Sequence, residues 1–192
     1  MQQSRQKSVT LVLGGVRSGK SRYAQQLAER SDLVTFIATA ERREDAEMQA
    51  KIERHRAERP AHWTTVEEPL QLASSIEQAG SAGHVILVDC LTIFAANLLE
   101  ASGDDQQARQ SSIDDLCNVL DRSSATIILV SNEVGSGVVP AYASGRRFRD
   151  LVGEINQRVA AVADTVLMLV AGLPLALKGT PPQYVGARRE PR

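Results

Sequence analysis

The chain has 192 residues, 43% of them hydrophobic and 4% aromatic, and its formal net charge is −1. This length suits one domain with a substantial core, and the composition is typical of a soluble globular protein rather than a disordered or fibrous one. Because the charges balance, the composition excludes nucleic-acid binding through a general basic field, and we expect no nucleic-acid partner.

The N-terminus and the cysteines indicate a cytoplasmic protein. The first residues, MQQSRQKSVT, contain no apolar signal core, and no apolar run reaches the roughly 20 residues that span a membrane. Cys90 lies in an apolar run and Cys117 in a predicted helix, a pattern that allows neither a disulfide framework nor a CxxC metal site. We therefore expect a reducing compartment and no membrane span.

In chain order, strands and helices alternate. Apolar, β-branched runs predict buried strands at residues 8–15, 33–39, 84–92, 125–134 and 164–172, followed by an edge strand or short extension at 173–179. Helical periodicity or composition predicts helices at 19–30, 41–59, 70–76, 93–99, 112–122 and 142–163, with a Thr-rich link after Trp63 and a polar connector at 101–110. The alternation predicts an α/β fold with a mainly parallel sheet flanked by helices.

No repeat or long linker divides the chain, so we expect a single domain at residues 9–178. Residues 1–8 are predicted to be a flexible N-terminus. The Pro-, Gly- and Arg-rich residues 179–192 are predicted to be a flexible tail.

The segment GGVRSGKS matches the phosphate-loop motif G-x-x-x-x-G-K-[ST]. It follows a predicted strand and precedes a predicted helix, which is the context that the motif requires. Backbone N–H groups of such a loop point at phosphate oxygens, and the helix N-terminus favours negative charge. Lys20 would reach the β and γ phosphates and the Ser21 hydroxyl would bind Mg²⁺. The predicted nucleotide-binding residues here are Gly14, Gly15, Val16, Arg17, Ser18, Gly19, Lys20 and Ser21.

Asp89 lies at the end of the predicted strand HVILVDCLT. A carboxylate in this position can hold Mg²⁺ directly or through water. The alternative is that Asp89 caps the next helix. The phosphate loop upstream favours the metal role.

His55 lies in a charged segment that ends at Pro60. With helical spacing, Met48, Ile52, His55 and Arg59 form one stripe, which places His55 at the border of a buried face. Neighbouring arginines favour a neutral imidazole, which can attack phosphorus, whereas a helix C-terminus favours the imidazolium. From this pattern alone, a solvated surface histidine is the better interpretation.

The other histidines carry no predicted catalytic role. His62 is expected to pack under Trp63 rather than to contact a base or ribose, and His84 opens a strand. Asn132 and Glu133 fit two roles equally, substrate or metal positioning and local turn bonding. Arg146, Arg147 and Arg149 fit a phosphate contact, a subunit contact or a plain solvated helix start.

Six segments together resemble one enzyme family. The resemblance is to the bifunctional adenosylcobinamide kinase and adenosylcobinamide-phosphate guanylyltransferase family and covers residues from about 9 to 178. The segments, in the family's order, are GGVRSGKS, VTFIATAE, KIERHRAERPAHWTTVEEP, VILVDCLT, VSNEVGSGVVP and GRRFRDLVGEINQRVAAVADTVLMLVAG.

The resemblance implies a P-loop NTPase fold of the RecA-like type and two reactions. Adenosylcobinamide would be phosphorylated with ATP or GTP, and GMP from GTP would then be transferred to adenosylcobinamide phosphate, giving adenosyl-GDP-cobinamide in cobalamin biosynthesis. It also implies Mg²⁺ as cofactor and a homotrimer.

The resemblance also implies site residues. The histidine that the family guanylylates falls on His55, so the resemblance makes His55 the leading catalytic candidate together with Lys20. Beyond the phosphate loop, the implied nucleotide contacts are Thr39, Ala40, Glu41, Arg56, Ala57, Glu58, Arg59, Glu67 and Asp89, with Ser21 and Asp89 at the metal. Which of Glu67 and Glu68 meets the ligand stays open.

Two other functions fit the residues less well. One is a P-loop small-molecule kinase in which His55 is incidental. The other is a nucleotide-dependent regulatory ATPase module, for which a longer chain or a polymerising or DNA-binding surface would be expected.

Overall fold

The computed structural model describes residues 8–40 and 59–181. The predicted helix at 41–59 therefore falls almost entirely outside the described residues, and so do Glu41, His55, Arg56, Ala57 and Glu58. The predicted flexible ends also lie outside them, apart from Ser8 and residues 179–181.

A seven-stranded sheet forms the centre of the molecule, in the order β3-β2-β4-β5-β1-β6-β7. All neighbouring pairs are parallel except β6 and β7, which are antiparallel. The mainly parallel α/β fold predicted from the alternation is confirmed. The strands are β1 (Ser8–Gly14), β2 (Val34–Ala38), β3 (Thr64–Glu67), β4 (Val85–Asp89), β5 (Thr126–Asn132), β6 (Thr165–Val170) and β7 (Leu173–Lys178).

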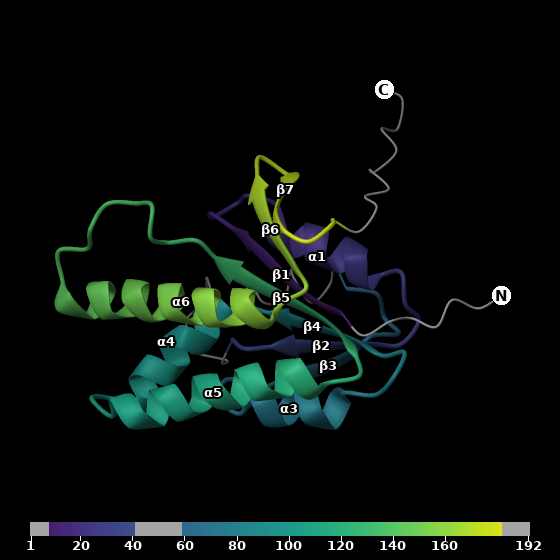
Figure 1. Ribbon diagram of the computed structural model, residues 1–192, viewed down its shortest axis with the longest axis horizontal. Coiled ribbons are helices and arrows are strands. Elements are labelled where there is room, and N and C mark those ends of the chain that lie inside the picture. The colour runs from purple at the N-terminus through teal and green to yellow at the C-terminus, as the bar shows by residue number, and fades with distance from the viewer. Residues whose placement is uncertain (1–7, 41–58, 182–192) are drawn as a thin grey trace.

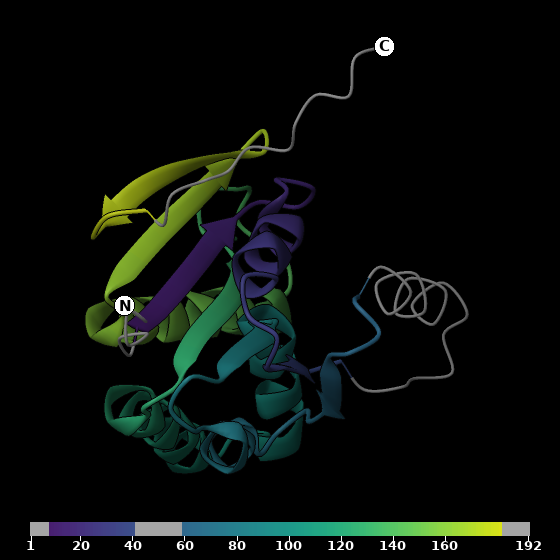
Figure 2. The same ribbon diagram turned by 90° about the vertical axis from the view of Figure 1, so that its right-hand side faces the viewer.

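Helices cover both faces of the sheet. Figures 1 and 2 show α3, α4, α5 and α6 on one side and α1 on the other. Because successive side chains of a strand point to opposite faces, Leu11 and Leu13 of β1 pack with the four-helix side and Val12 packs with α1. The helices are α1 (Lys20–Ala28), α3 (Leu72–Ala79), α4 (Leu91–Ser102), α5 (Gln106–Arg122) and α6 (Ala143–Val162).

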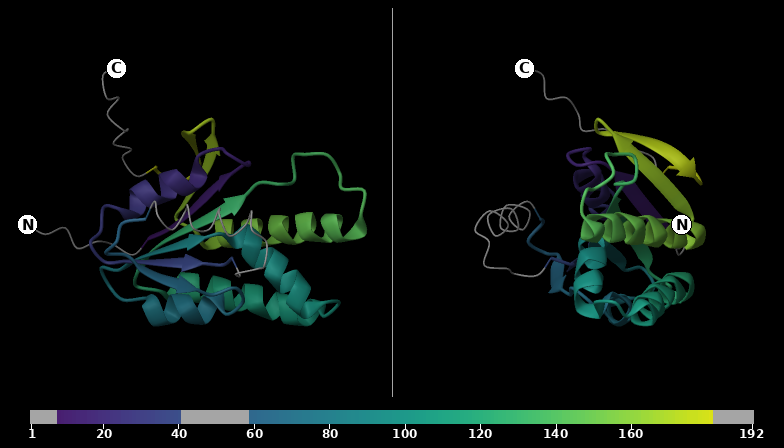
Figure 3. Two further views of the ribbon diagram at one scale, coloured as in Figure 1. Left: turned by 180° about the vertical axis from the view of Figure 1, so that it is seen from behind. Right: turned by 90° about the vertical axis from the view of Figure 1, so that its left-hand side faces the viewer.

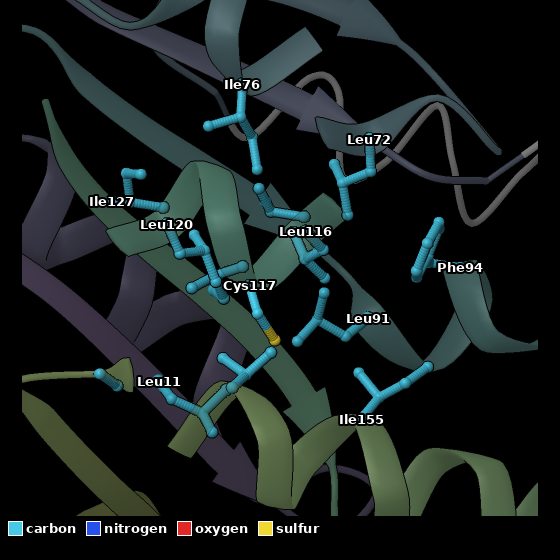
Figure 4. Close-up of a cluster of buried hydrophobic side chains, with 14 of the residues drawn as sticks. Leu11, Leu72, Ile76, Leu91, Phe94, Leu116, Cys117, Leu120, Ile127 and Ile155 are labelled. Carbon is cyan, nitrogen blue, oxygen red and sulfur yellow. The ribbon is translucent and has the colours of Figure 1, made fainter. Parts of the chain in front are cut away.

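The larger core cluster lies between the sheet and the four helices. Leu116 of α5 and Ile127 of β5 have no exposed surface, and Leu91 and Ile155 are nearly as buried. Figure 4 shows these side chains converging from α4, α5, α6 and β5. Each fully buried aliphatic side chain of this kind stabilises the fold by about 1.5–3 kcal/mol. The core thus fixes the strands whose ends carry the predicted site.

Several elements differ from their predicted extents; helix α3, for example, lies at Leu72–Ala79 instead of 70–76, and β4 ends at Asp89 instead of at 92. Residues 64–67, expected as a link, form the edge strand β3, where two threonines and a valine suit a short strand paired with β2. Helix α5 begins at Gln106, inside the expected polar connector, because the Asp105 carboxylate accepts a hydrogen bond from the Ala108 N–H at 3.0 Å. Helix α4 extends two residues earlier and three later than expected. The edge strand predicted at 173–179 is confirmed as β7.

Within the described residues, none of the helices is both long and apolar enough for a membrane crossing.

Candidate functional site

The phosphate-loop segment joins the carboxyl end of β1 to the N-terminus of α1, as predicted. The Gly15 carbonyl accepts hydrogen bonds from the Ser18 N–H at 3.3 Å and from Lys20 Nζ at 3.1 Å. Two neighbouring segments hold the loop, since the Glu133 N–H donates to the Gly14 carbonyl and the Gly172 N–H donates to the Ser18 carbonyl. The loop is therefore fixed in place by the ends of β5 and β6.

Two glycines of the loop are required by space and backbone conformation. Gly19 has φ 92°, a left-handed conformation that strains other residues, and a Cβ there would lie 3.3 Å from the Gly172 Cα. A Cβ on Gly14 would lie 2.9 Å from the Leu169 carbonyl oxygen and would collide with Ser18 Oγ. The motif glycines thus let the loop lie directly against the turn that joins β6 to β7.

Asp89 and Ser21 lie in positions that suit a magnesium ion. Asp89 is half-buried at the carboxyl end of β4, and only β5 separates that strand from β1. Ser21 is in the first turn of α1. The described residues contain no group of three or more His, Cys, Asp or Glu side chains that could enclose a metal. A hydroxyl and one carboxylate fit Mg²⁺, which binds few protein oxygens alongside phosphate and water.

The alternative role for Asp89, capping the following helix, stays open. Cys90 rather than Asp89 occupies the N-cap position of α4, and the Cys90 side chain makes no capping hydrogen bond. Burial, aided by the nearby Asp89 charge, raises the pKa of the Cys90 thiol to about 11. Cys90 therefore stays a neutral thiol near pH 7, and a neutral thiol is a poor nucleophile.

Thr39 follows β2 and is completely buried. Its hydroxyl donates to the Cys90 carbonyl at 2.7 Å and accepts from the Cys90 N–H at 2.9 Å. Its N–H donates to the Asp89 carbonyl, and its own carbonyl accepts from Asn97 Nδ2 at 2.8 Å. These hydrogen bonds tie Thr39 to the start of α4 and to the end of β4, and its predicted nucleotide contact stays a prediction. Ala40, the next residue, is half-buried.

Glu67 and Glu68 have different surroundings at the end of β3. One carboxylate oxygen of Glu68 accepts hydrogen bonds from the Leu70 N–H at 2.9 Å and the Gln71 N–H at 2.7 Å, at the start of α3. Glu67 is exposed. The Glu68 carboxylate is thus bonded to the start of α3, and which of the two glutamates contacts the ligand stays open.

Charged side chains in and near the segment after β5 form hydrogen bonds with backbone groups of that segment. Figure 3 shows residues 133–142 as a long arch between β5 and α6. Glu133 accepts a 2.6 Å hydrogen bond from the Gly135 N–H, as in the turn alternative. Arg146 donates to the carbonyls of Pro140 and Ala141 and so holds the arch.

Further along α6, Arg147 forms a salt bridge with Asp104 at 2.9 Å, and Arg149 forms one with Asp150 at 3.1 Å.

The role of Asn132, in substrate or metal positioning or in local turn bonding, remains open. Its Oδ1 is buried and has no hydrogen-bond partner within the described part of the chain.

Arg59 is the one described residue of the predicted Arg56–Arg59 set. Its guanidinium carbon lies 3.5 Å from the centre of the Phe36 ring, a cation–π contact with β2.

His62 is exposed whereas Trp63 is buried, so the expectation that His62 packs under Trp63 is wrong. His84 Nε2 lies 3.1 Å from the Thr35 hydroxyl, a structural contact away from the site.

The family comparison adds to this geometry. Residues 10–177 match the model of one protein family, described as cobinamide kinase / cobinamide phosphate guanyltransferase. The chain belongs to this family. The match extends from β1 to β7, so it includes every strand and helix that positions the site.

Curated relatives agree with the family assignment. The chain is 48% identical over 172 residues to a Pseudomonas aeruginosa protein named bifunctional adenosylcobalamin biosynthesis protein CobP, covering 89% of this chain and 98% of the relative. It is 40% identical over 179 residues to the CobU protein of the same description from Escherichia coli K12, covering 88% of this chain and 98% of the relative.

Solved structures show the same P-loop NTPase fold at low sequence identity. A Pyrococcus horikoshii protein, Project ID PH0250, matches with a TM-score of 0.55 at 10% identity and covers 92% of this chain and 89% of that one. The type III secretion ATPase EscN from enteropathogenic E. coli matches with a TM-score of 0.54 at 14% identity, covering 86% of this chain and 43% of that one. The chain spans less than half of EscN, and these likenesses concern the fold alone.

Proposed function

We propose that this family member phosphorylates the aminopropanol hydroxyl of adenosylcobinamide and then transfers GMP from GTP to the new phosphate. The product is adenosyl-GDP-cobinamide, an intermediate of cobalamin biosynthesis in the cytoplasm. The observation that carries this proposal is the family match over residues 10–177, which contains the phosphate loop with Lys20 at the carboxyl edge of the sheet.

For the kinase step, the loop binds the triphosphate of ATP or GTP. Backbone N–H groups of the loop and the N-terminus of α1 favour its negative charge. Lys20 Nζ donates to the Gly15 carbonyl of the same loop, and its ammonium would bind the β and γ phosphates of the nucleotide. The acceptor hydroxyl loses its proton and attacks the γ phosphorus directly while the bond to the β,γ-bridging oxygen breaks, which releases ADP or GDP; no covalent enzyme intermediate is needed.

Ser21 and Asp89 are the residues that would hold Mg²⁺. The ion, when bound, offsets phosphate charge. The protein's part is to present a hydroxyl on α1 and a carboxylate on β4 at the same edge of the sheet.

For the guanylyl step, His55 is the proposed nucleophile. The imidazole nitrogen forms a bond to the α phosphorus of GTP while the bond to the bridging oxygen breaks, which releases pyrophosphate. A phosphate oxygen of adenosylcobinamide phosphate then attacks the same phosphorus and returns His55 to its free form. Arg56 and Arg59 would offset charge on the phosphate oxygens. The other proposed GTP contacts are Thr39, Ala40, Glu41, Ala57, Glu58 and Glu67.

The product assay tests the function. Purified protein given adenosylcobinamide, ATP and GTP should form adenosylcobinamide phosphate first and adenosyl-GDP-cobinamide second, with one pyrophosphate released for each guanylyl transfer. Mass spectrometry of the corrinoids measures both products. Formation of adenosylcobinamide phosphate without the GDP derivative would show that the protein is a kinase that does not transfer GMP. Failure to modify adenosylcobinamide at all would overturn the proposal.

The protein's proposed assembly is a homotrimer, and β7 offers an apolar surface for it. Leu173, Leu175 and Leu177 occupy every second position of this edge strand and are 58–71% exposed. We expect Leu175→Asp to dissociate the trimer, because a carboxylate would be buried at the contact. Sedimentation equilibrium should give the mass of three chains for the wild type and of one for the variant.

Leu33→Asp is the matched control for the assembly, since Leu33 is 59% exposed and precedes β2, far from β7 in the strand order. It should leave the trimer intact. A monomeric wild type would reject the trimer, and an intact Leu175→Asp trimer would remove β7 from the contact.

A further inference from the structure

The arch between β5 and α6, residues 133–142, exposes three large apolar side chains. Val138 is 95% exposed, Tyr142 80% and Val139 61%. Figures 1 and 3 show the arch projecting past the end of β5 before the chain enters α6. Single exposed apolar residues are ordinary on a protein surface, whereas several at one place indicate a site of interaction. The arch is therefore a candidate binding surface.

Hydrogen bonds hold the arch in shape. Arg146 Nη1 donates to the Pro140 carbonyl at 3.0 Å and to the Ala141 carbonyl at 2.7 Å. Near the start of the arch, the Glu133 carboxylate accepts from the Gly135 N–H at 2.6 Å. None of these bonds uses the three exposed apolar side chains. A segment that is already ordered loses little conformational entropy on binding, so the arch suits a ligand that contacts those side chains.

The arch begins directly beside the phosphate loop. Asn132, the last residue of β5, is aligned with Gly14 in the parallel pairing of β5 and β1, and the Glu133 N–H donates to the Gly14 carbonyl at 3.2 Å. The Asn132 N–H donates to the Thr92 hydroxyl at 2.7 Å, and its carbonyl accepts from Asn156 Nδ2 at 3.0 Å. Contacts from α4, α6 and the phosphate loop thus fix the base of the arch.

The strand order places the arch on the side from which the acceptor would approach. Asp89, the proposed Mg²⁺ ligand, ends β4, and β5 lies between β4 and β1. Because this ion is bound at the β and γ phosphates, the γ end of the triphosphate would face the β5 side of the loop. The acceptor oxygen attacks the γ phosphorus from the side opposite the leaving oxygen, which is the side away from the β phosphate. The arch follows β5, whereas β7 lies on the other side of β1.

The proposed acceptor has an apolar part that such a surface can bind. Adenosylcobinamide carries its hydroxyl on a short aminopropanol arm, which is joined to a large, flat corrin ring. When the hydroxyl reaches the γ phosphorus, the ring must lie outside the phosphate loop, on the neighbouring surface. Small-molecule sites are lined mainly by aliphatic and aromatic side chains, and an aromatic side chain can lie against a flat conjugated ring.

We propose that Val138, Val139 and Tyr142 bind the corrin ring of adenosylcobinamide while its hydroxyl attacks the γ phosphorus. The arch is then the acceptor subsite of the kinase step, and the phosphate loop is the nucleotide subsite. This inference rests on the proposed function, and it assigns no part of nucleotide binding to the arch.

The test is a variant that combines Val138→Asp with Tyr142→Ala. Both side chains are exposed, and the Tyr142 side chain makes no capping hydrogen bond at the start of α6, so the fold should be unchanged. Transfer from ATP labelled at the γ phosphorus is measured over a range of adenosylcobinamide concentrations. We expect KM for adenosylcobinamide to rise about tenfold to a hundredfold, because apolar contact is lost and a charge faces the ring. The kcat and the KM for ATP should stay within about threefold of wild type.

Direct binding provides a second measurement. Equilibrium dialysis of adenosylcobinamide, followed by its visible absorbance, should show a similar loss of affinity without nucleotide. Leu33→Asp is the matched control, since Leu33 is 59% exposed and precedes β2, at the edge of the sheet opposite the phosphate loop. It should leave the dialysis result and both KM values unchanged.

Three results would overturn the inference. The first is an arch variant with unchanged KM and unchanged affinity for adenosylcobinamide. The second is an equal rise of KM for ATP, which would show a general disturbance of the phosphate loop. The third is a changed mass in sedimentation equilibrium, which would make the arch a contact between chains. A wild type that neither binds nor phosphorylates adenosylcobinamide would instead reject the proposed function itself.

Discussion

Replacing His55 with alanine is expected to abolish the guanylyl label on the protein while the kinase step continues. The wild type, mixed with GTP labelled at the α phosphorus, should retain label in a bond that acid breaks and alkali does not, as a phosphorus–nitrogen bond requires. Loss of a covalent nucleophile removes the only group that forms this bond, and we expect a decrease on the order of a thousandfold or more. Cys90 cannot substitute, because its buried thiol is protonated near pH 7.

His62→Ala is the matched control for this experiment. His62 lies seven residues after His55 and is exposed, and it has no role in the proposed chemistry. Its variant should take up label at the wild-type rate. Label retained by His55→Ala would remove His55 from the reaction. A wild type that phosphorylates adenosylcobinamide without ever binding label would favour a small-molecule kinase.

The phosphate loop was predictable because its signal is local. The hydrogen bonds of the Ser18 N–H and of Lys20 Nζ to the Gly15 carbonyl join residues at most five positions apart, and Gly14 and Gly19 are glycines that the motif itself specifies. The parallel sheet was equally predictable, since apolar strands and helices alternate throughout. From these two patterns it follows that the loop and Asp89 share the carboxyl edge of the sheet.

Other features depend on distant residues, and local patterns could not reveal them. In the sequence, Asn97 is a polar residue among apolar residues of a helix, and the two carbonyls that accept hydrogen bonds from its amide lie dozens of residues away. The two hydrogen bonds of the Thr39 hydroxyl go to the backbone of Cys90, 51 residues later at the start of α4, and no local pattern around Thr39 indicates them. The strand β3 has only four residues, which is too few for a clear period, so that its threonines and valine indicate a strand only once they pair with β2.

The adjacent glutamates show what side-chain geometry adds. In the sequence, Glu67 and Glu68 are equivalent candidates because both follow the same strand. In the structure, Glu68 accepts two backbone N–H bonds at the start of α3, which commits it to the fold. Only the placement of α3 relative to β3 distinguishes the two residues.

Lys20→Ala is expected to remove the kinase activity without unfolding the protein. The described contact of Lys20 Nζ, with the Gly15 carbonyl, is at an exposed site and contributes little to stability, so the thermal midpoint should change by no more than a few degrees. Removing one preorganised donor to a developing phosphate charge costs about a hundredfold to a thousandfold in kcat. The measurement is transfer of γ-labelled phosphate from ATP to adenosylcobinamide, with thermal unfolding in parallel.

Lys178→Ala provides the matched control for loss of a lysine charge. Lys178 is exposed, and its Nζ likewise donates to backbone carbonyls, those of Ala160 and Ala161 at the end of α6. Since β7 lies two strands from β1, this variant should keep full kinase activity. Equal losses in both variants would indicate a general effect of charge. Normal turnover by Lys20→Ala would mean that the phosphate loop does not hold the reacting triphosphate, because no arrangement of that loop around a γ phosphate leaves its lysine without a role.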